Sequence, residues 1–139
     1  MRAIKYIVLH CTAGPQTQTI QAIKDYWKAP KPKGCGWKSP GYHYIIEPDG
    51  DAVSLLPIEQ VSNGVAGHNA NSIHISYIGG ANGVDNRTPA QKATQIRLVK
   101  ELKAKFPHAE IKGHRDFPGV KKLCPSFDVK TWLKAVNLG

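Results

Sequence analysis

The sequence predicts an α/β fold, with a single domain spanning residues 1–139 and a central mixed β-sheet flanked by about three helices. Strand-like and helix-like segments alternate in the order β-α-β-β-β-α-β-α, which is typical of a sheet covered by helices. With 139 residues, 41% of them hydrophobic, the chain suits one domain with a substantial core. Neither a linker-like run nor an internal repeat interrupts this pattern.

The first predicted strand covers residues 3–9, which alternate loosely and are rich in isoleucine, valine, leucine and tyrosine. It ends at His10, and Thr12-Ala13-Gly14-Pro15 breaks the extended pattern. Neighbouring residues of a strand point to opposite faces of a sheet, so His10 and Cys11 are expected on different faces. We therefore assign the side chain of Cys11 to the core.

A helix follows, capped at its start by Thr17 or Thr19 and ended by Pro30 and Pro32. Its apolar residues recur three and four positions apart and are Ile20, Ile23 and Trp27. Residues 29–41, with three prolines and three glycines, form a loop.

A hairpin is predicted from residues 42–47 and 51–56, two strands joined by Pro48-Asp49-Gly50. Residues 64–71 form a loop, and residues 72–80 form a further apolar strand.

The second half of the chain predicts two helices and a short strand. Thr88-Pro89-Ala90-Gln91 is a capping box with proline at the first helical position, and the helix ends before Pro107. Residues 110–112 form the strand, and Ser126 caps the last helix. The residues expected to face the core are Ala93, Ile96, Val99 and Leu102 in one helix, and Val129, Trp132, Leu133 and Val136 in the other.

Positive charge is concentrated in the C-terminal part of the chain. The net charge is +9, and residues 87–139 hold 12 Lys and Arg against 4 Asp and Glu, a local excess of +8. Such a basic half indicates an anionic partner: nucleic acid, an anionic membrane surface or a carboxylate-rich polymer. A solvated helix face rich in lysine is the alternative. Specific nucleic-acid binding is not expected, because the sequence contains no recognition motif.

The N-terminus carries a short apolar run of about four residues before His10, too short for a signal-peptide core or a membrane span. We therefore expect synthesis in the cytoplasm without a signal peptide, and no membrane insertion.

Two histidines and one cysteine form a candidate metal site. His10 ends the first strand, His114 follows the strand at 110–112, and Cys124 lies in a loop stiffened by two prolines and two glycines. Strand ends in α/β proteins share a crevice, and two imidazoles with one thiolate suit zinc, with a fourth position left for water. The chain has three cysteines, and this odd count argues against a disulfide scaffold. Taken alone, the spacing leaves open that each residue is an ordinary buried side chain.

Six motifs follow one another along the chain. They are Ile7-Val8-Leu9-His10-Cys11-Thr12-Ala13, Gly36-Trp37 with Gly41-Tyr42-His43-Tyr44-Ile45-Ile46 and Asp49-Gly50, Gly67-His68-Asn69 with Asn71-Ser72-Ile73, Thr88-Pro89-Ala90-Gln91, Gly113-His114-Arg115-Asp116, and Lys122 with Cys124-Pro125-Ser126-Phe127-Asp128. These motifs resemble, in the same order, those of N-acetylmuramoyl-L-alanine amidases, in the zinc amidase group that includes small phage lysozymes and the peptidoglycan recognition proteins. The resemblance covers about residues 4–134 and implies a central mixed sheet flanked by helices, which agrees with the order of elements above.

The resemblance implies that one zinc ion is bound by His10, His114 and Cys124. It also implies that Tyr42 is the catalytic tyrosine and that Lys122 is the lysine of the phage-type members. An activated water would attack the amide carbonyl, and Lys122 would approach the oxyanion that forms. The hydroxyl of Tyr42 would orient the water or pass a proton to the leaving amine. Without the resemblance, Tyr42 could be a packed aromatic residue and Lys122 a solvated loop residue.

His68 matches a position that lines the substrate groove in many relatives. Two features depart from the family pattern: His74 stands where relatives usually carry a small residue, and residues 29–40 are locally distinct. Both departures bear on the shape of the groove rather than on the metal ligands. By strand alternation, His43 should point away from Tyr42 and be structural.

The implied activity is zinc-dependent hydrolysis of the amide bond between N-acetylmuramic acid and L-alanine of the peptidoglycan stem peptide, by a monomer. An endolysin of a phage or prophage fits this activity, reaching the cell wall after lysis, through a holin or by a secretion system. Two alternatives are a peptidoglycan-binding module without catalysis and a phage protein that binds and regulates RNA polymerase. The presence of Cys124 favours the enzyme, because non-catalytic members typically lack the metal cysteine.

Overall fold

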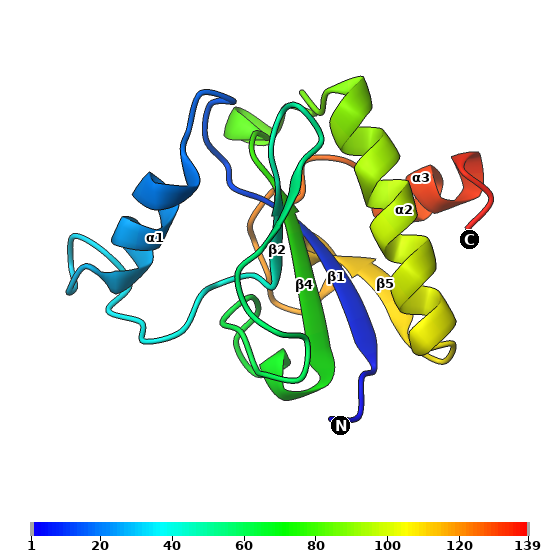
Figure 1. Ribbon diagram of the computed structural model, residues 1–139, viewed down its shortest axis with the longest axis horizontal. Coiled ribbons are helices and arrows are strands. Elements are labelled where there is room, and N and C mark those ends of the chain that lie inside the picture. Colours follow the sequence, from blue (N-terminus) through cyan, green and yellow to red (C-terminus); the bar gives the residue numbers. More distant parts are fainter. Residues whose placement is uncertain (1, 139) are drawn as a thin grey trace.

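The computed structural model describes residues 2–138 and has a five-stranded mixed sheet in the order β3-β2-β4-β1-β5 (Figure 1). Strand β3 is antiparallel to β2, and the other neighbouring strands are parallel. The strands are β1 (Tyr6–Cys11), β2 (Tyr44–Ile46), β3 (Ala52–Ser54), β4 (Ser72–Tyr77) and β5 (Glu110–Gly113). With three α-helices between and after them, this arrangement confirms the predicted α/β fold and the predicted order of elements.

Strand alternation sorts the side chains of the central strand β1 onto the two faces of the sheet. Ile7, Leu9 and Cys11 belong to the larger core, which helices α2 and α3 cover. Val8 and His10 belong to the opposite face. Helix α1 lies on that second side, separate from α2 and α3 (Figure 1). The prediction that Cys11 is a core residue is therefore confirmed, since it is 3% exposed.

Helix α1 (Ile20–Lys28) begins after Thr19, whose side chain accepts a hydrogen bond from the backbone N–H of Ala22 at 3.1 Å. Of the two predicted caps, Thr19 is thus the one used. Ile23 and Trp27 pack with Ile45 and so join the helix to β2.

The predicted hairpin is present with shorter strands. The N–H of Glu47 donates to the carbonyl of Asp51 at 2.8 Å, and Gly50 adopts a left-handed φ of 91° at the turn. This conformation is easily reached by glycine, which explains the Asp-Gly pair in the turn.

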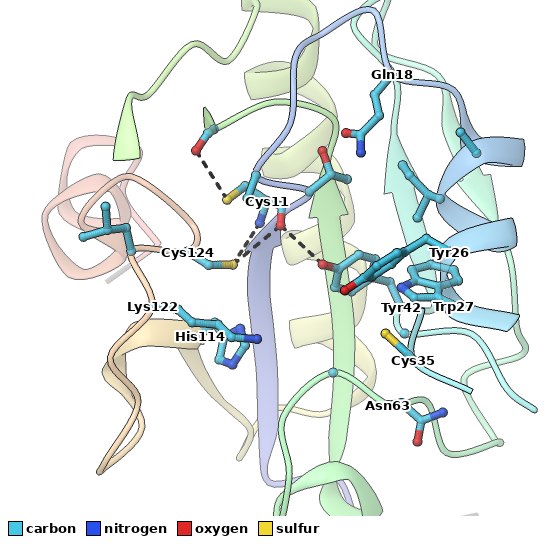
Figure 2. A pocket seen from close by; sticks show the side chains of 18 of the residues that line it. Cys11, Gln18, Tyr26, Trp27, Cys35, Tyr42, Asn63, His114, Lys122 and Cys124 are labelled. Carbon is cyan, nitrogen blue, oxygen red and sulfur yellow. Dashed lines mark hydrogen bonds between the residues drawn. The ribbon is translucent and has the colours of Figure 1, made fainter. Parts of the chain in front are cut away.

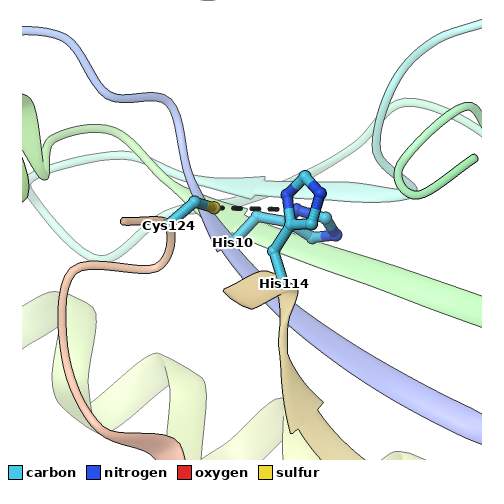
Figure 3. A group of neighbouring side chains, drawn as sticks. All are labelled: His10, His114 and Cys124. Atoms are coloured by element: carbon cyan, nitrogen blue, oxygen red, sulfur yellow. Dashed lines mark hydrogen bonds between the residues drawn. The ribbon is translucent and has the colours of Figure 1, made fainter. Parts of the chain in front are cut away.

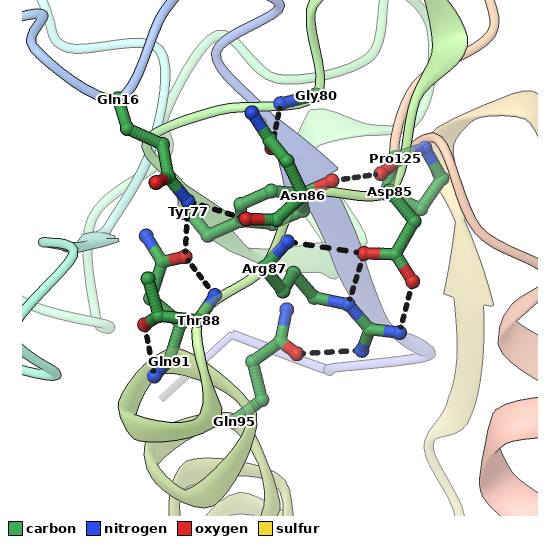
Figure 4. Close-up of polar contacts among 10 residues, drawn as sticks. All are labelled: Gln16, Tyr77, Gly80, Asp85, Asn86, Arg87, Thr88, Gln91, Gln95 and Pro125. Carbon is green, nitrogen blue, oxygen red and sulfur yellow. Dashed lines mark hydrogen bonds and ion pairs between the residues drawn. The ribbon is translucent and has the colours of Figure 1, made fainter.

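Helix α2 (Pro89–Lys105) has the predicted capping box, in which Thr88 and Gln91 each satisfy a backbone N–H of the other (Figure 4). Its predicted core face is only half correct. Val99 and Leu102 are buried, whereas Ala93 is exposed and Ile96 is only partly buried.

Two buried polar residues, Gln91 and Thr94, explain why the core face of α2 differs from the predicted one. The side-chain amide of Gln91 donates to the carbonyls of Ile46 and Ile78 at 3.1 and 3.0 Å, and the hydroxyl of Thr94 donates to the carbonyl of Gly50 at 2.6 Å. Buried polar side chains that satisfy backbone oxygens can face a core, so apolar periodicity alone does not locate this face.

The last helix, α3 (Val129–Ala135), begins after Asp128, so the predicted cap at Ser126 is wrong. Ser126 has a left-handed φ of 69°, is buried, and donates its hydroxyl to the carbonyl of Gly80 at 2.9 Å. Its hydroxyl thus joins the preceding loop to the sheet instead of capping the helix. Of the predicted core residues, Val129, Trp132 and Leu133 are buried and Val136 is partly buried.

Within residues 2–138, no helix combines the length and the apolar character needed to cross a lipid bilayer.

Candidate metal centre

His10, His114 and Cys124 meet at one edge of the sheet, with their ligand atoms all within 4.8 Å of one another (Figure 3). His10 Nδ1 lies 3.8 Å from Cys124 Sγ, and the centres of the two imidazole rings are 4.8 Å apart. All three side chains are buried. The structure therefore brings together the three residues proposed as ligands from the sequence.

The parallel pairing of β1 and β5 places the two histidines. Leu9 pairs with Gly113, so His10 and His114 are the next residues at the same end of two neighbouring strands. The carboxyl ends of parallel strands meet at one edge of a sheet, where side chains can converge on a common ligand.

Backbone contacts hold Cys124 against β1. The N–H of Cys11 donates to Cys124 Sγ at 3.1 Å, and the N–H of Arg115 donates to the carbonyl of Cys124 at 2.9 Å. The hydroxyl of Tyr77 in β4 donates to the carbonyl of Pro125 at 2.7 Å. These contacts fix the loop on both sides of the thiol.

Arg87 adds a further anchor, just before α2 (Figure 4). Its guanidinium lies 3.5 Å from the ring centre of Phe127 and is held by Asp85 at 2.8 Å and by Gln95 at 2.9 Å. Stacking of a guanidinium on an aromatic ring stabilises a partly buried contact. The segment that carries Cys124 is thereby attached to α2.

The donor set fits zinc. Zinc–nitrogen and zinc–sulfur bonds of about 2.1 and 2.3 Å place neighbouring ligand atoms about 3.5 Å apart. The separation of 3.8 Å between His10 Nδ1 and Cys124 Sγ is close to this requirement. His114 and Cys124 also line a cavity, so a metal ion held by the cluster would be reachable from it.

Burial keeps the imidazoles neutral. Burial, and to a lesser degree the charge of Lys122, lower the pKa of His114 to about 4. Burial also lowers the pKa of His10 well below its usual value and that of His74 to about 3. A neutral imidazole is the form that binds a metal ion, so these pKa values leave both histidines of the cluster in that form at pH 7.

The pKa of Cys124 is shifted in the opposite direction to the pKa values of the histidines. The neighbouring Cys11 side chain and burial raise the pKa of the Cys124 thiol. Metal binding requires the thiolate, so metal uptake at this site should release the thiol proton.

These shifts predict that protein stripped of metal becomes less stable as the pH falls from about 7 to 5. The histidines have a lower pKa in the folded chain than their usual value of 6.5, so below about pH 6.5 the unfolded chain takes up protons first. The slope that each such histidine contributes approaches about 1.4 kcal/mol per pH unit at the lower end of this range and is smaller near pH 7. Urea unfolding at pH 7 and pH 5 measures the effect.

The control for this experiment is His108→Gln, because His108 is exposed on the surface. This variant should show the same loss of stability between the two pH values as the wild type. An unfolding midpoint that does not change with pH in the wild type contradicts the prediction.

A cavity of about 720 Å³ adjoins the cluster. Figure 2 shows Tyr42 and Trp27 on one side of it, and His114, Lys122 and Cys124 on the other. The predicted catalytic residues Tyr42 and Lys122 thus line the same cavity as two of the three ligands.

Tyr42 comes from the loop before β2, and its ring centre is 4.9 Å from that of His10. Its hydroxyl donates to the carbonyl of Cys11 at 3.3 Å. Burial, and then the neighbouring thiols of Cys124 and Cys11, raise the pKa of Tyr42. The phenol therefore keeps its proton at neutral pH and can act as a hydrogen-bond donor in the cavity.

His68 is placed differently from the other predicted site residues. Its ring packs against Phe117 and Tyr6, with ring centres 4.6 and 6.0 Å away, and it is not among the residues that line the described cavity. A contact between His68 and substrate remains a prediction. His43 is fully buried, as expected for a structural residue, and its Nδ1 accepts a hydrogen bond from the backbone N–H of His74.

One residue beside the cluster was not assigned to the site from the sequence. His74 Nδ1 lies 2.8 Å from His10 Nε2, and the His74 ring is fully buried. Strand β4 pairs with β1 so that His74 is opposite Val8, which puts His74 on the same face as His10. The alternation of residues was visible in the sequence, but the pairing of these two strands was not.

Comparison with known proteins gives consistent matches. A sequence model of the N-acetylmuramoyl-L-alanine amidase family matches residues 1–127. The endolysin of Klebsiella phage KP32 is 33% identical over 138 residues, covering 95% of this chain and 87% of that protein.

Two solved structures are also similar. The endolysin of the Thermus scotoductus bacteriophage Ph2119 has 28% identity and a TM-score of 0.80, covering 100% of this chain and 86% of its own. The N-acetylmuramoyl-L-alanine amidase LysC from Clostridium intestinale has 26% identity and a TM-score of 0.82, covering 99% of this chain and 88% of its own.

Proposed function

Because the chain belongs to the N-acetylmuramoyl-L-alanine amidase family and is a peptidoglycan-degrading enzyme, we propose that it depends on zinc and cleaves one particular bond. That bond joins the lactyl group of N-acetylmuramic acid to L-alanine of the stem peptide. The observation that carries the proposal is the convergence of His10, His114 and Cys124 beside a cavity that Tyr42 and Lys122 also line.

His10, His114 and Cys124 would hold the metal. Zinc bound there would lower the pKa of a water molecule towards 7 and polarise the scissile carbonyl. The remaining steps depend on side chains of this chain. The cavity beside His114 and Cys124 would give the substrate amide access to a metal ion held there.

Lys122 would stabilise the transition state. It lines the cavity, and its positive charge is one of the causes, after burial, that lower the pKa values of His10 and His114, which supports a position near the cluster. As water adds to the amide carbonyl, negative charge develops on the carbonyl oxygen. A cation positioned beside that oxygen stabilises the oxyanion.

Tyr42 would supply a hydrogen bond on the other side of the cavity. Its protonated hydroxyl can orient the attacking water or donate a proton to the leaving amine of L-alanine. The present acceptor of this hydroxyl, the carbonyl of Cys11, adjoins the cluster and holds the phenol close to it.

The cellular setting is inferred from those relatives that are phage endolysins. We propose that residues 1–139 form one amidase domain that reaches the cell wall once the membrane barrier is breached. The excess of +8 on residues 87–139 suits a substrate whose stem peptides carry carboxylates. The names of the relatives give no support to the RNA polymerase partner considered from the sequence.

Digestion of purified peptidoglycan tests the proposal. We expect mass spectrometry to show free stem peptides that begin with L-alanine, together with glycan chains that keep the muramic lactyl group. A chelator should stop their release, and added zinc should restore it. Stem peptides that stay attached while the chain carries zinc would favour the non-catalytic binding module. Cleavage at another bond would refute the assigned bond alone.

A further inference from the structure

A series of hydrogen bonds leads from His10 through the side chains of His74 and Asn69 to the backbone N–H of Val65. His10 Nε2 lies 2.8 Å from His74 Nδ1, and His74 Nε2 lies 2.9 Å from Asn69 Oδ1. Asn69 Oδ1 also accepts the backbone N–H of Val65 at 2.8 Å. The other ring nitrogen of His10, Nδ1, faces Cys124.

The position of each proton in this chain of contacts follows from the backbone amide. The N–H of Val65 can only donate, so the Asn69 atom that faces it is the carbonyl oxygen. His74 Nε2 faces the same oxygen and must therefore carry a proton. A neutral imidazole has one N–H, so His74 Nδ1 is an acceptor and His10 Nε2 carries the proton between them. The lone pair of His10 is thereby left on Nδ1, where it faces the cluster.

The His74 ring is held in this orientation by its surroundings. It is 0% exposed, and a Cβ atom added to Gly64 would lie 2.3 Å from His74 Nδ1, which shows how closely the loop backbone covers the ring. Gly64 and Asn63 also line the cavity. The loop that forms part of the cavity wall therefore also covers the contact between His74 and His10.

We propose that Asn69 and His74 are positioning residues for the metal ligand His10, fixing its ring orientation and the tautomer whose Nδ1 can bind zinc. The proposal rests on the zinc site described above. A second residue that accepts the free N–H of a ligating histidine orients the ring and makes it a better ligand. In this chain the accepting residue is His74. Asn69 in turn orients the His74 ring, and the backbone N–H of Val65 holds the Asn69 side chain.

Nitrogen-15 NMR of the imidazoles in zinc-stripped wild-type protein tests the proton positions directly. We expect both His10 and His74 to be neutral at pH 7 with the proton on Nε2. This measurement needs neither metal nor a variant. A His10 ring with its proton on Nδ1 overturns the proposal.

Zinc affinity provides the second test, measured by competition with a chelator. His74→Leu removes the acceptor while filling much of the same space, and its zinc affinity should fall about 10- to 100-fold. His74→Asn places an oxygen where Nδ1 was, and should recover most of the affinity. Ile75→Val is the matched control, since it perturbs the same buried strand on the opposite face and should bind zinc like the wild type.

The outcomes separate this proposal from the function it rests on. A wild-type chain that binds no zinc overturns the proposed function. Equal zinc affinity of the wild type and His74→Leu overturns the positioning role of His74. If His74→Leu does not fold, the wild-type tautomers decide the question alone.

Discussion

The Cys124→Ser variant is expected to retain no stoichiometric zinc and to lose cell-wall hydrolysis. A serine hydroxyl does not ionise near neutral pH, so only His10 and His114 would remain as ligands. The loss of activity should exceed the roughly 100-fold that removal of a supporting contact costs. Elemental analysis of the purified variant and release of dye from labelled cell walls measure the two effects.

Two comparisons make this result specific. Cys35→Ser should keep one zinc per chain, because Cys35 is a half-buried thiol outside the cluster. Wild-type protein stripped of metal should resemble Cys124→Ser in thermal stability and in circular dichroism. Full hydrolytic activity in a Cys124→Ser chain without zinc would overturn the metal-dependent mechanism.

The Lys122→Met variant is expected to bind zinc normally and to lose about 100-fold or more in kcat. Methionine keeps an unbranched side chain in the cavity but removes the positive charge that we propose to stabilise the developing oxyanion. Since the charge matters chiefly in the transition state, KM should change much less than kcat. Kinetics on a soluble muropeptide, with zinc content determined in parallel, measure both effects.

Lys121→Met is the matched control, because it makes the same change at the neighbouring lysine, which does not line the described cavity. Its kcat should stay close to that of the wild type. Equal losses in the two variants would indicate a general effect of surface charge on binding the cell wall. A Lys122→Met chain with unchanged kcat would remove Lys122 from the catalytic residues.

The order of elements could be predicted from the sequence because it depends on local patterns. The loose alternation of apolar residues predicted β1, and the capping box predicted the start of α2. His10 and His114 were candidates as residues at the ends of predicted strands, and the family resemblance supplied the reason to group them with Cys124.

What could not be predicted depends on which segments meet in space. Ser126 has the residue type of a helix cap, but its hydroxyl serves Gly80, which is distant in sequence. The burial of Gln91 depends on the carbonyls of Ile46 and Ile78, which its side-chain amide satisfies and which lie in distant segments. The contact between His74 and His10 depends on the pairing of β1 with β4, which no local pattern specifies.

The backbone of Cys11 contacts two side chains of the candidate site. The N–H of this residue holds the sulfur of Cys124, and its carbonyl receives the hydroxyl of Tyr42. Two side chains of the centre are thus oriented by the main chain at one position, whose own side chain lies in the core. Replacing that side chain by another of similar size leaves both contacts in place. Conservative replacements of similar size at position 11 should therefore be tolerated, whereas proline removes the donor and a large or charged side chain does not fit the buried site.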